Sequence, residues 1–456
     1  MAKPQLTIPV CKGDKLELAV KTLASSGDGL CRHEGYTLFA PGALPGDRVI
    51  AEVVKTTPRF GVTSVVERLD SSPNRVDAPC PVFPACGGCK FQDLDYQSQL
   101  AFKIQVIEDS LKHIAKMDSL PEITALPNDL PYHYRNKGSF AVQLIDKDLR
   151  VGFYRHGTHE VIDSNQCDIL VEPINEIKEW IRGLLKRHRV LIYDETKHKG
   201  FFRGLMIRHS DTTGETLIGL ITAQGKFPRP FLQELTATDP LDQFNITGIV
   251  QNLNLQNTNI ILGVKNRVLW GENRMREQLG DLQFQISLGS FFQVNSRQTE
   301  KLYDLIQQWA EPLGGVVIDA YCGVGCIALW LAKAGMEVIG IEEYAPAVHD
   351  ARESAQMNGI NNCEFLQGGA EERLLPFAGQ SIETLVLDPP RKGCSEKVMD
   401  AIPLIQPEQI IYVSCNPSTL ARDLSRLRGY EIADIRAIDL FPQTHHVETA
   451  VLLKKK

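Results

Sequence analysis

The sequence lacks long hydrophobic runs, since no uninterrupted apolar stretch approaches the roughly 20 residues that span a bilayer. It also lacks a charged N-terminal region followed by an apolar run, which is the pattern of a secretory signal. These absences predict a cytoplasmic protein with no membrane partner. In a reducing compartment, eleven cysteines are not expected to form disulfides, so clusters among them are better explained as metal ligands or catalytic groups.

An excess of positive charge is missing as well. The chain has 49 lysines and arginines against 56 aspartates and glutamates, for a formal net charge of -7. This balance argues against a nonspecific polyanion binder, although local basic surfaces remain open. Basic and aromatic residues interleave in YHYRNKG (132–138) and KHKGFFRGLMIRH (197–209). Such runs are usually solvated faces, and the alternative is that they contact RNA phosphates and bases.

Internal repeats and low-complexity tracts are also absent, and the length of 456 residues predicts about three domains. Alternating apolar positions predict a small β-barrel over residues 1–70. Residues 71–285 predict a mixed α+β central domain, in which a helix at 96–117 can dock on the catalytic domain. Residues 286–456 alternate apolar strands with helices, so the predicted fold class is α/β with a C-terminal, doubly wound, Rossmann-like domain.

A glycine turn follows the first strand of that C-terminal domain, in VVIDAYCGVGCIALWLAKAG. Gly323, Gly325 and Ala328 satisfy a dinucleotide-binding fingerprint, and Glu342 ends the next strand, where it can bind ribose hydroxyls. Spacing alone leaves NAD and S-adenosylmethionine open. Asp319 favours S-adenosylmethionine, because a carboxylate there would repel a pyrophosphate but can face the ammonium group of a methionyl moiety.

Two reactive side chains follow the fourth and fifth strands of the same predicted sheet. Asp388 follows SIETLVL and Cys415 follows IIYVS, so both are expected on the rim that carries the glycine turn. Asn416 suits a helix N-cap and Pro417 suits the first helical position. A helix N-terminus beside Cys415 is expected to lower the pKa of the thiol toward neutrality. The alternative is that Cys415 is a small core residue.

A separate group of cysteines lies near the start of the predicted central domain, in CPVFPACGGCK, and one more cysteine follows in SNQC. Four thiolates could hold zinc or an iron-sulfur cluster, and spacing alone leaves both open. The two glycines within the motif allow the tight turn that a shared metal requires. The candidate ligands are Cys80, Cys86, Cys89 and Cys167.

Six motifs, taken together and in order, resemble the RNA uracil-C5 methyltransferases, in particular the ribosomal RNA branch that carries an iron-sulfur cluster. They are SFFQVN (290–295), DAYCGVG (319–325), VIGIE (338–342), LDPPRKG (387–393), VSCNPSTLARD (413–423) and HHVETAVLL (445–453). The resemblance covers nearly the whole chain. It implies a TRAM domain as the N-terminal barrel, which resembles the oligonucleotide-binding fold, and a [4Fe-4S] cluster on the four cysteines.

The resemblance also implies a role for each site residue. S-adenosylmethionine would be contacted by Gln293, Tyr321, Glu342 and Asp388, with Cys415 as nucleophile and Glu448 as base. The residue types suit the chemistry, because carbon 5 of uracil becomes nucleophilic only after a thiolate adds at carbon 6. A base must then remove the proton from carbon 5. Asp388 can also act toward the uracil edge, while His445 and His446 are neighbours that can shape the site.

The predicted function is methylation of carbon 5 of a specific unpaired or loop uridine in 23S ribosomal RNA, with no obligate protein partner. A transfer RNA enzyme of the same class is an alternative, and such enzymes are expected to lack the barrel and the four-cysteine site. An NAD-dependent oxidoreductase and a noncatalytic RNA-binding iron-sulfur protein are the alternatives outside the class. Phe291 or Phe292 could stack on a base that leaves its helix, or could pack in the core.

Overall fold

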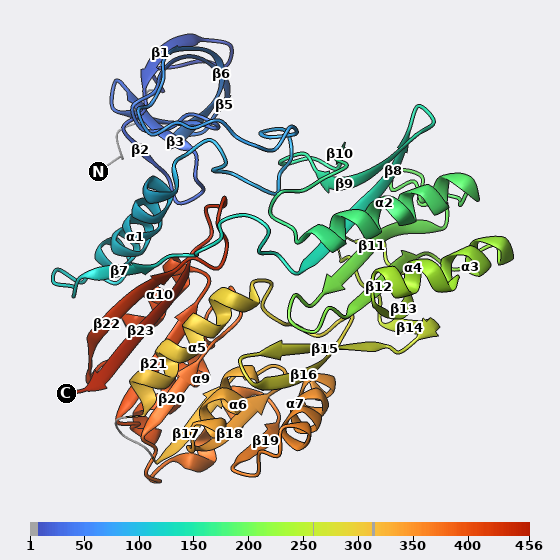
Figure 1. Cartoon of the computed structure of the whole chain (residues 1–456). Helices are drawn as coiled ribbons and strands as arrows, with labels where there is room; N and C mark the ends of the chain where they lie inside the picture. The colour runs from blue at the N-terminus through green and yellow to red at the C-terminus, as the bar shows by residue number, and fades with distance from the viewer. Residues whose placement is uncertain (1–7, 259, 312–314) are drawn as a thin grey trace.

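The computed structural model describes residues 8–258, 260–311 and 315–456 of the chain. Figure 1 shows a β-barrel at the N-terminal end, a sheet with helices on one side in the middle, and a larger sheet with helices on both sides at the C-terminal end. The predicted α/β fold with an N-terminal barrel and a mixed central domain is confirmed.

The barrel is a six-stranded sheet in the order β1-β5-β6-β4-β3-β2. Buried and exposed residues alternate along β5, as expected for a strand with one face on a core. The core side chains include Leu18, Leu38 and Val49. The strands are β1 (Lys15–Ala19), β2 (Thr22–Leu23), β3 (Gly29–His33), β4 (Tyr36–Ala40), β5 (Arg48–Thr56) and β6 (Phe60–Asp70).

The central sheet has seven strands in the order β10-β9-β8-β11-β12-β13-β14. Its strands are β8 (Lys137–Ile145), β9 (Asp148–Tyr154), β10 (Val161–Asp163), β11 (Phe202–His209), β12 (Thr216–Thr222), β13 (Ile246–Leu253) and β14 (Lys265–Gly271). One face packs on the helices α2 (Glu172–Arg187), α3 (Arg229–Leu235) and α4 (Thr238–Gln243). A two-stranded hairpin of β15 (Arg274–Leu279) and β16 (Leu282–Ser287) connects to the last sheet.

The C-terminal sheet has eight strands in the order β19-β18-β17-β20-β21-β23-β22-β7. Strands β17 to β21 are parallel, and β23 runs antiparallel between β21 and β22. The predicted switch point therefore lies between β17 and β20. The strands are β17 (Val316–Ala320), β18 (Glu337–Glu342), β19 (Cys363–Gln367), β20 (Thr384–Leu387), β21 (Gln409–Ser414), β22 (Tyr430–Ile438) and β23 (Glu448–Lys455).

Helices bury both faces of this sheet, which is why its parallel strands are mostly apolar. One face packs on α5 (Ser296–Ala310), α6 (Cys326–Lys333) and α7 (Ala345–Met357). The other packs on α1 (Tyr96–His113), α8 (Ala370–Arg373), the 3-10 helix η1 (Leu375–Phe377), α9 (Glu396–Ile405) and α10 (Pro417–Leu424).

Two segments from early in the chain complete the C-terminal sheet. Helix α1 packs against α10, and β7 (Ile123–Leu126) pairs in parallel with β22 at the edge of the sheet. A side-chain ion pair between Lys103 and Asp439 fixes α1 to the segment between β22 and β23, with both side chains buried. The sequence placed both segments in residues 71–285 and did not predict that β7 joins this sheet.

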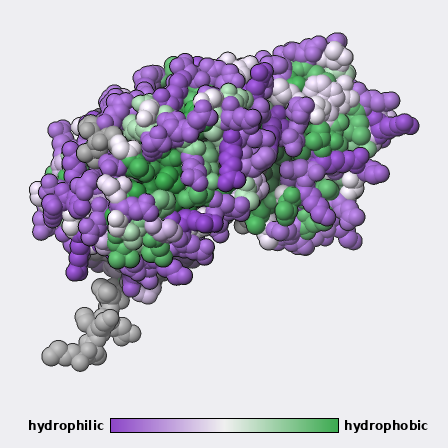
Figure 2. Space-filling view, turned by 90° about the horizontal axis from the view of Figure 1, so that it is seen from below, coloured by the Kyte–Doolittle hydropathy of each residue, from purple (hydrophilic) through white to green (hydrophobic). Residues whose placement is uncertain are grey.

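The surface is polar over most of the face seen from below, where hydrophobic side chains gather in separate patches (Figure 2). None of the helices in the described part of the chain is both long enough and apolar enough to cross a membrane.

Candidate active site

Cys415 and Glu448 face each other across two neighbouring strands. Ser414, the last residue of β21, is paired with Thr449 of β23, so the next residue along β21 lies opposite Glu448. The Cys415 thiol is half-buried, and the Glu448 side chain is only 3% exposed. Strand pairing thus brings the predicted nucleophile and base together, although 32 residues lie between them in the sequence.

The segment DPPRKG, which follows β20, completes this group with Asp388 and Arg391. Asn416 donates from its side-chain amide to the main-chain oxygen of Arg391 over 3.1 Å, and its side-chain oxygen caps α10 by accepting from Ser418 N. Thr419 Oγ1 donates to the same Arg391 oxygen over 3.3 Å. The predicted N-cap is confirmed, and it also fixes the Asp388 segment relative to Cys415.

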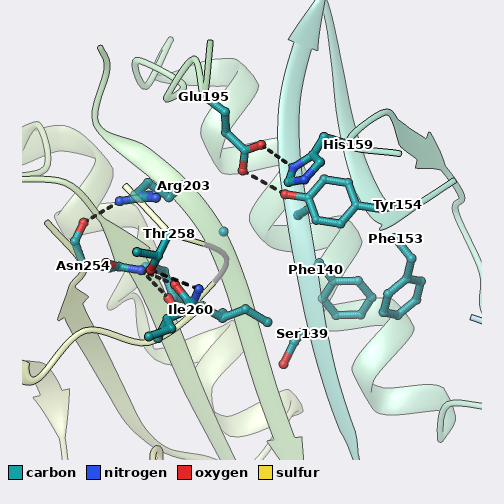
Figure 3. A pocket seen from close by; sticks show the side chains of 14 residues that line it. Ser139, Phe140, Phe153, Tyr154, His159, Glu195, Arg203, Asn254, Thr258 and Ile260 are labelled. Atoms are coloured by element: carbon teal, nitrogen blue, oxygen red, sulfur yellow. Dashed lines mark hydrogen bonds and ion pairs between the residues drawn. The ribbon is translucent and has the colours of Figure 1, made fainter. Parts of the chain in front are cut away.

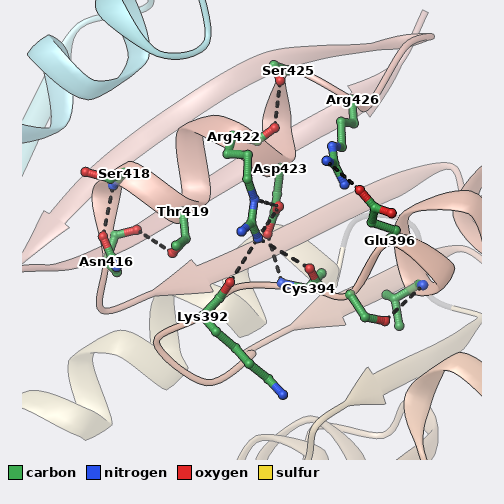
Figure 4. A network of polar contacts seen from close by, with 12 residues as sticks. Lys392, Cys394, Glu396, Asn416, Ser418, Thr419, Arg422, Asp423, Ser425 and Arg426 are labelled. Atoms are coloured by element: carbon green, nitrogen blue, oxygen red, sulfur yellow. Dashed lines mark hydrogen bonds and ion pairs between the residues drawn. The ribbon is translucent and has the colours of Figure 1, made fainter.

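A buried carboxylate continues this attachment along α10 (Figure 4). Asp423 Oδ2 accepts from Cys394 N at 2.9 Å and from the Tyr412 hydroxyl at 2.7 Å. Arg422 pairs with the other oxygen of Asp423 and donates to the main-chain oxygen of Lys392. The loop that carries Asp388 is therefore hydrogen-bonded to the helix that follows Cys415 at several points.

The two carboxyl groups of the site hold their protons more tightly than usual. Burial raises the pKa of Asp388 to about 7. Burial, followed by the nearby Asp388, raises the pKa of Glu448 well above its usual value, while the guanidinium of Arg391 opposes this. Like charges close together in a buried place cannot both ionise freely, so at neutral pH this pair holds at least part of a proton.

The expectation that helix α10 lowers the pKa of the Cys415 thiol was wrong. Burial, and then the charge of Glu448, raise that pKa to about 11, although the guanidinium of Arg391 lowers it. Desolvation and two neighbouring carboxylates outweigh the partial charge of one helix end. The thiol of the free protein is therefore protonated at neutral pH.

The glycine turn after β17 forms the other half of the site. Gly323 has a φ of 56°, and a Cβ at this position would meet no other atom within 4 Å. Its N–H donates to Glu342 Oε2 over 3.0 Å, and Glu342 Oε1 accepts from Tyr344 N over 2.7 Å. Glu342 is thus fixed beside an open backbone cradle, as predicted from the spacing.

Asp319 lies near the end of β17, next to this cradle, with both carboxylate oxygens buried and without a hydrogen-bond partner among the described residues. Burial raises the pKa of Asp319 well above its usual value, and the charges of Asp388 and Glu342 add to the rise. These charge effects show that Asp319 is near both halves of the site. A buried carboxyl without a partner is costly, so this position favours a cationic or hydrogen-bonding ligand.

Gln293 and Tyr321 lie at the borders of the crevice. The main-chain oxygen of Gln293 accepts from the Asn136 side chain at 3.2 Å, so the central sheet holds the SFFQVN segment. Tyr321 has a φ of 70°, and its phenol lies beside the Cys394 thiol. Phe292 is buried against Phe284, whereas Phe291 is 69% exposed and is the only one of the two predicted phenylalanines that is free to stack on a ligand.

The segment that carries His445 and His446 is hydrogen-bonded to two earlier segments of the chain. The main-chain oxygen of Gln443 accepts from Lys90 N at 2.8 Å and from Phe91 N at 3.0 Å, directly after the cysteine motif. The Gln443 amide is also paired with Gln99 of α1. Burial lowers the pKa of His446 to about 4, so this imidazole is neutral near pH 7.

The four predicted cysteine ligands approach one another from separate segments. Burial raises the pKa of Cys89 to about 12, and the charges of Cys167, Cys86 and Cys80 add to this rise. Even so, no three His, Cys, Asp or Glu side chains in the described ranges lie close enough to hold a single metal ion. The thiols are therefore neighbours, but they do not form a preassembled site for one ion.

Arg391 is a charged residue of the candidate site that was not predicted from the sequence. It lies beside Cys415, Glu448 and His446, and it lowers the pKa of each. The sequence could have indicated it, because Arg391 is the first cationic residue after the Asp-Pro-Pro segment at the edge of the predicted sheet.

The chain is similar to known RNA methyltransferases over most of its length. The model of the tRNA (uracil-5-)-methyltransferase family matches residues 95–456, and the TRAM domain model matches residues 9–66. A Halalkalibacterium halodurans protein described as an uncharacterized RNA methyltransferase is 39% identical over 464 residues, covering 100% of both chains. An Oceanobacillus iheyensis protein with the same description is 40% identical over 98% of each chain.

A solved structure is similar over nearly the whole chain. It is the Pyrococcus abyssi tRNA (uracil-54, C5)-methyltransferase in complex with S-adenosyl-L-homocysteine, which has a TM-score of 0.79 and 28% identity and covers 96% of this chain and 100% of that one. That extent includes the barrel, so the expectation that transfer RNA enzymes lack it was wrong. The chain described here belongs to the tRNA (uracil-5-)-methyltransferase family and is an RNA uracil-C5 methyltransferase with an N-terminal TRAM domain.

Proposed function

We propose that the chain transfers a methyl group from S-adenosylmethionine to carbon 5 of a uridine through a covalent adduct on Cys415. The observation that carries this proposal is that Cys415 lies opposite Glu448 and close to Asp388. Asp388 in turn raises the pKa of Asp319, next to the glycine turn. A nucleophile, a base and a glycine turn with a buried carboxyl that favours a cationic ligand thus lie along one edge of the sheet.

The cradle fits S-adenosylmethionine. Asp319 offers a buried carboxyl to the ammonium group, and Glu342 offers a fixed carboxylate to ribose hydroxyls. The open side of Gly323 allows close approach of the ligand to the backbone. Gln293, Tyr321 and Asp388 are proposed as further contacts, although the phenol of Tyr321 points toward Cys394.

The reaction proposed for these residues begins when the Cys415 thiol releases its proton to solvent and the thiolate adds to carbon 6 of uracil, so that the electron pair of the ring double bond moves toward oxygen 4. The Asp388 carboxyl, which is partly protonated at neutral pH, can donate a hydrogen bond to that developing charge. Carbon 5 then takes the methyl group of bound S-adenosylmethionine, and S-adenosylhomocysteine leaves with the electron pair of the broken bond between sulfur and methyl. Glu448, in its ionised form, then removes the proton from carbon 5, and the electron pair of that bond restores the ring double bond and expels the Cys415 thiolate.

The protonated thiol of the free protein is consistent with this sequence of steps. Each carboxylate near Cys415 raises the pKa of the thiol, so a positive charge in the cradle lowers it again. Thiolate formation is then expected mainly after the methyl donor binds. This order protects the thiol from reacting before both substrates are present.

We propose 23S ribosomal RNA as the substrate, with an unpaired or loop uridine as the target, because the four-cysteine motif resembles the ribosomal RNA branch. Transfer RNA is the second candidate, since the Pyrococcus abyssi enzyme named above acts on a tRNA. A flipped uridine could stack on the exposed Phe291.

Mapping 5-methyluridine in a strain that lacks the gene tests this assignment. We expect one or more ribosomal RNA positions to lose the methyl group and to regain it when the purified protein is added. Loss confined to transfer RNA would reverse the substrate assignment. Unchanged 5-methyluridine in both RNAs, together with no activity of the purified protein, would contradict the function.

We further propose that Cys80, Cys86, Cys89 and Cys167 hold a [4Fe-4S] cluster. The donor set of four thiols suits this group, and a four-iron cluster holds its ligand sulfurs farther apart than a single zinc ion does. Neighbouring thiols that do not converge on one ion are consistent with that wider spacing. The proposed role is structural, since this loop donates two main-chain hydrogen bonds to Gln443 beside the catalytic segment.

Replacing Cys89 with serine is expected to abolish cluster binding and to lower the thermal unfolding temperature by several degrees. Without the cluster, the 80–91 loop loses the metal–sulfur bonds that would connect its cysteines to Cys167. Iron and sulfide content, visible absorption and calorimetry measure the result. The exposed Cys11 provides the matched control, because serine at that position should leave iron content unchanged. Full iron content in the Cys89 variant would contradict the ligand assignment.

Replacing Arg391 with methionine is expected to shift the pH dependence of adduct formation toward higher pH. Arg391 lowers the pKa of Cys415, so its loss reduces the thiolate fraction at neutral pH by about tenfold for each pKa unit gained. Quenched-flow measurement of adduct formation across pH tests this. Lys392→Met is the control, since Lys392 is an exposed cation whose side chain extends away from the network in Figure 4. Equal shifts in both variants would indicate a general charge effect.

A further inference from the structure

The two basic and aromatic runs noted in the sequence lead into neighbouring strands of the central sheet, β8 and β11. Lys137 of β8 is paired with Arg208 of β11, so their side chains lie on the same face. This face is opposite the helix-covered one, because Phe140 and Ile207 point into the core beneath α2. Arg208 donates to the main-chain oxygen of Ser290 in the SFFQVN motif. The cationic pair therefore borders the candidate active site.

These cations have no compensating anion in the part of the chain described. No carboxylate forms an ion pair with Arg135, Lys137 or Arg208, although Arg208 is only 5% exposed and its Nε has no hydrogen-bond partner. Burial, and then the charges of Arg208 and Arg135, lower the pKa of Lys137 to about 7. Glu277 is the carboxyl group whose charge acts on Arg208, and burial raises the pKa of Glu277 to about 7. A buried positive cluster of this kind favours an anionic ligand.

The same face continues into a pocket of about 350 Å³. Ser139, two residues after Lys137, lies on its wall, and strand geometry puts the two positions about 7 Å apart. The other walls include Tyr154, Arg203, Asn254 and Ile260 (Figure 3). Tyr154 is 36% exposed, and its hydroxyl donates to Glu195 over 2.9 Å, which fixes the ring. The Ser139 hydroxyl makes no hydrogen bond to any described residue and is free to meet a ligand.

We propose that this face binds the RNA strand next to the target uridine, with a phosphate at Lys137 and Arg208 and a neighbouring nucleobase in the pocket lined by Tyr154. The inference rests on the proposed function and adds two subsites to it. Unpaired cations are followed, a few ångströms along β8, by a pocket that holds the free Ser139 hydroxyl and the fixed ring of Tyr154 from β9. This arrangement matches the order of phosphate and base in single-stranded RNA. The position of Arg208 against Ser290 makes the strand continuous with the catalytic crevice.

Salt dependence tests the phosphate subsite. Binding of a short oligouridylate is measured by fluorescence anisotropy over a range of salt concentrations. Lys137→Gln is expected to reduce the slope of log affinity against log salt by about 0.7, the value for one lost phosphate contact in a single strand. Lys147→Gln at the exposed turn between β8 and β9 removes the same charge and should leave the slope unchanged. Equal slopes in wild type and Lys137→Gln, or equal losses in both variants, would overturn the subsite.

Abasic substitution tests the base subsite, with the target nucleotide fixed at the catalytic site so that each neighbouring RNA position is known. The mapped RNA fragment carries 5-fluorouridine at the target, because a fluorine at carbon 5 cannot be removed as a proton and the Cys415 adduct persists. Tyr154→Ala is expected to weaken binding by about 5- to 150-fold, as for one lost base stack. One abasic position beside the target should cost wild type a similar factor and cost Tyr154→Ala nothing more. Additive losses at every position would overturn the proposal.

Controls separate this inference from the function on which it rests. Tyr154→Ala should bind S-adenosylhomocysteine as wild type does, which shows that the catalytic sheet is intact. Leu144→Ala, on the same strand as Ser139 and largely exposed, should bind RNA normally. If wild type forms the adduct and Tyr154→Ala binds equally well, only the base subsite is wrong. If wild type forms no adduct with any mapped RNA, the proposed function itself is wrong.

Discussion

Cys415→Ala is expected to lower the rate of RNA methylation by at least about 10⁴-fold, because no other group of the site can add to carbon 6 of the uracil. Cys415 is the half-buried thiol at the end of β21, and every other titratable group near it is a carboxyl, a cation or a neutral imidazole. Transfer of radiolabelled methyl groups to RNA from a strain that lacks the gene measures the loss.

Two controls make that result specific. The variant should bind S-adenosylhomocysteine normally, since the proposed contacts to the methyl donor lie on other strands. Cys363→Ala removes another partly buried thiol, on β19, and should retain activity. Residual methylation by Cys415→Ala at a tenth of the wild-type rate would show that the covalent mechanism is wrong.

Glu448→Gln is expected to slow turnover by about 10²- to 10⁴-fold while it traps protein on RNA. The amide cannot take the proton from carbon 5, so the methylated adduct accumulates instead of breaking down. Since burial and Asp388 already favour the neutral form of Glu448, the neutral glutamine should fit the site without unfolding the protein. A denaturing gel should show a band at the summed mass of protein and RNA.

The adduct must depend on both substrates and on the nucleophile. The double variant Cys415→Ala, Glu448→Gln should give no band, and omission of S-adenosylmethionine should reduce it. Glu396→Gln changes an exposed glutamate that pairs with Arg426 and should behave as wild type. Normal turnover by Glu448→Gln would mean that another group, of which Asp388 is the nearest, removes the proton.

Local sequence patterns predicted the parts of the site that each strand presents. The position of a residue at the carboxyl end of a parallel strand is fixed by topology, so Asp319, Glu342, Asp388 and Cys415 could be placed on one rim. The role of Glu448 came from the family resemblance. Its pairing opposite Cys415 depends on β23 lying antiparallel between β21 and β22, which periodicity does not reveal.

Effects that depend on the sum of the surroundings were not predictable in the same way. The helix after Cys415 was visible in the sequence, but the two carboxylates that help to outweigh it, Asp388 after β20 and Glu448 on β23, come from other parts of the chain. The pairing of β7 with β22 was missed for a related reason, since a four-residue strand carries little pattern of its own. Arg391 was missed because the side chains on which its charge acts, such as Cys415 and Glu448, are close to it only in the folded structure.

The ties between α1, β7 and the last strands have a consequence for how the chain is made. Lys103 precedes its partner Asp439 by 336 residues, so the buried ion pair cannot form until the last strands of the C-terminal sheet are being synthesised. Until then β21 has no partner on the side that β23 will occupy, and an unpaired edge strand invites association with other chains. Long-range closure of this kind is slow. A nascent chain stalled before β23 would therefore be both prone to aggregation and inert, because it has not yet acquired Glu448.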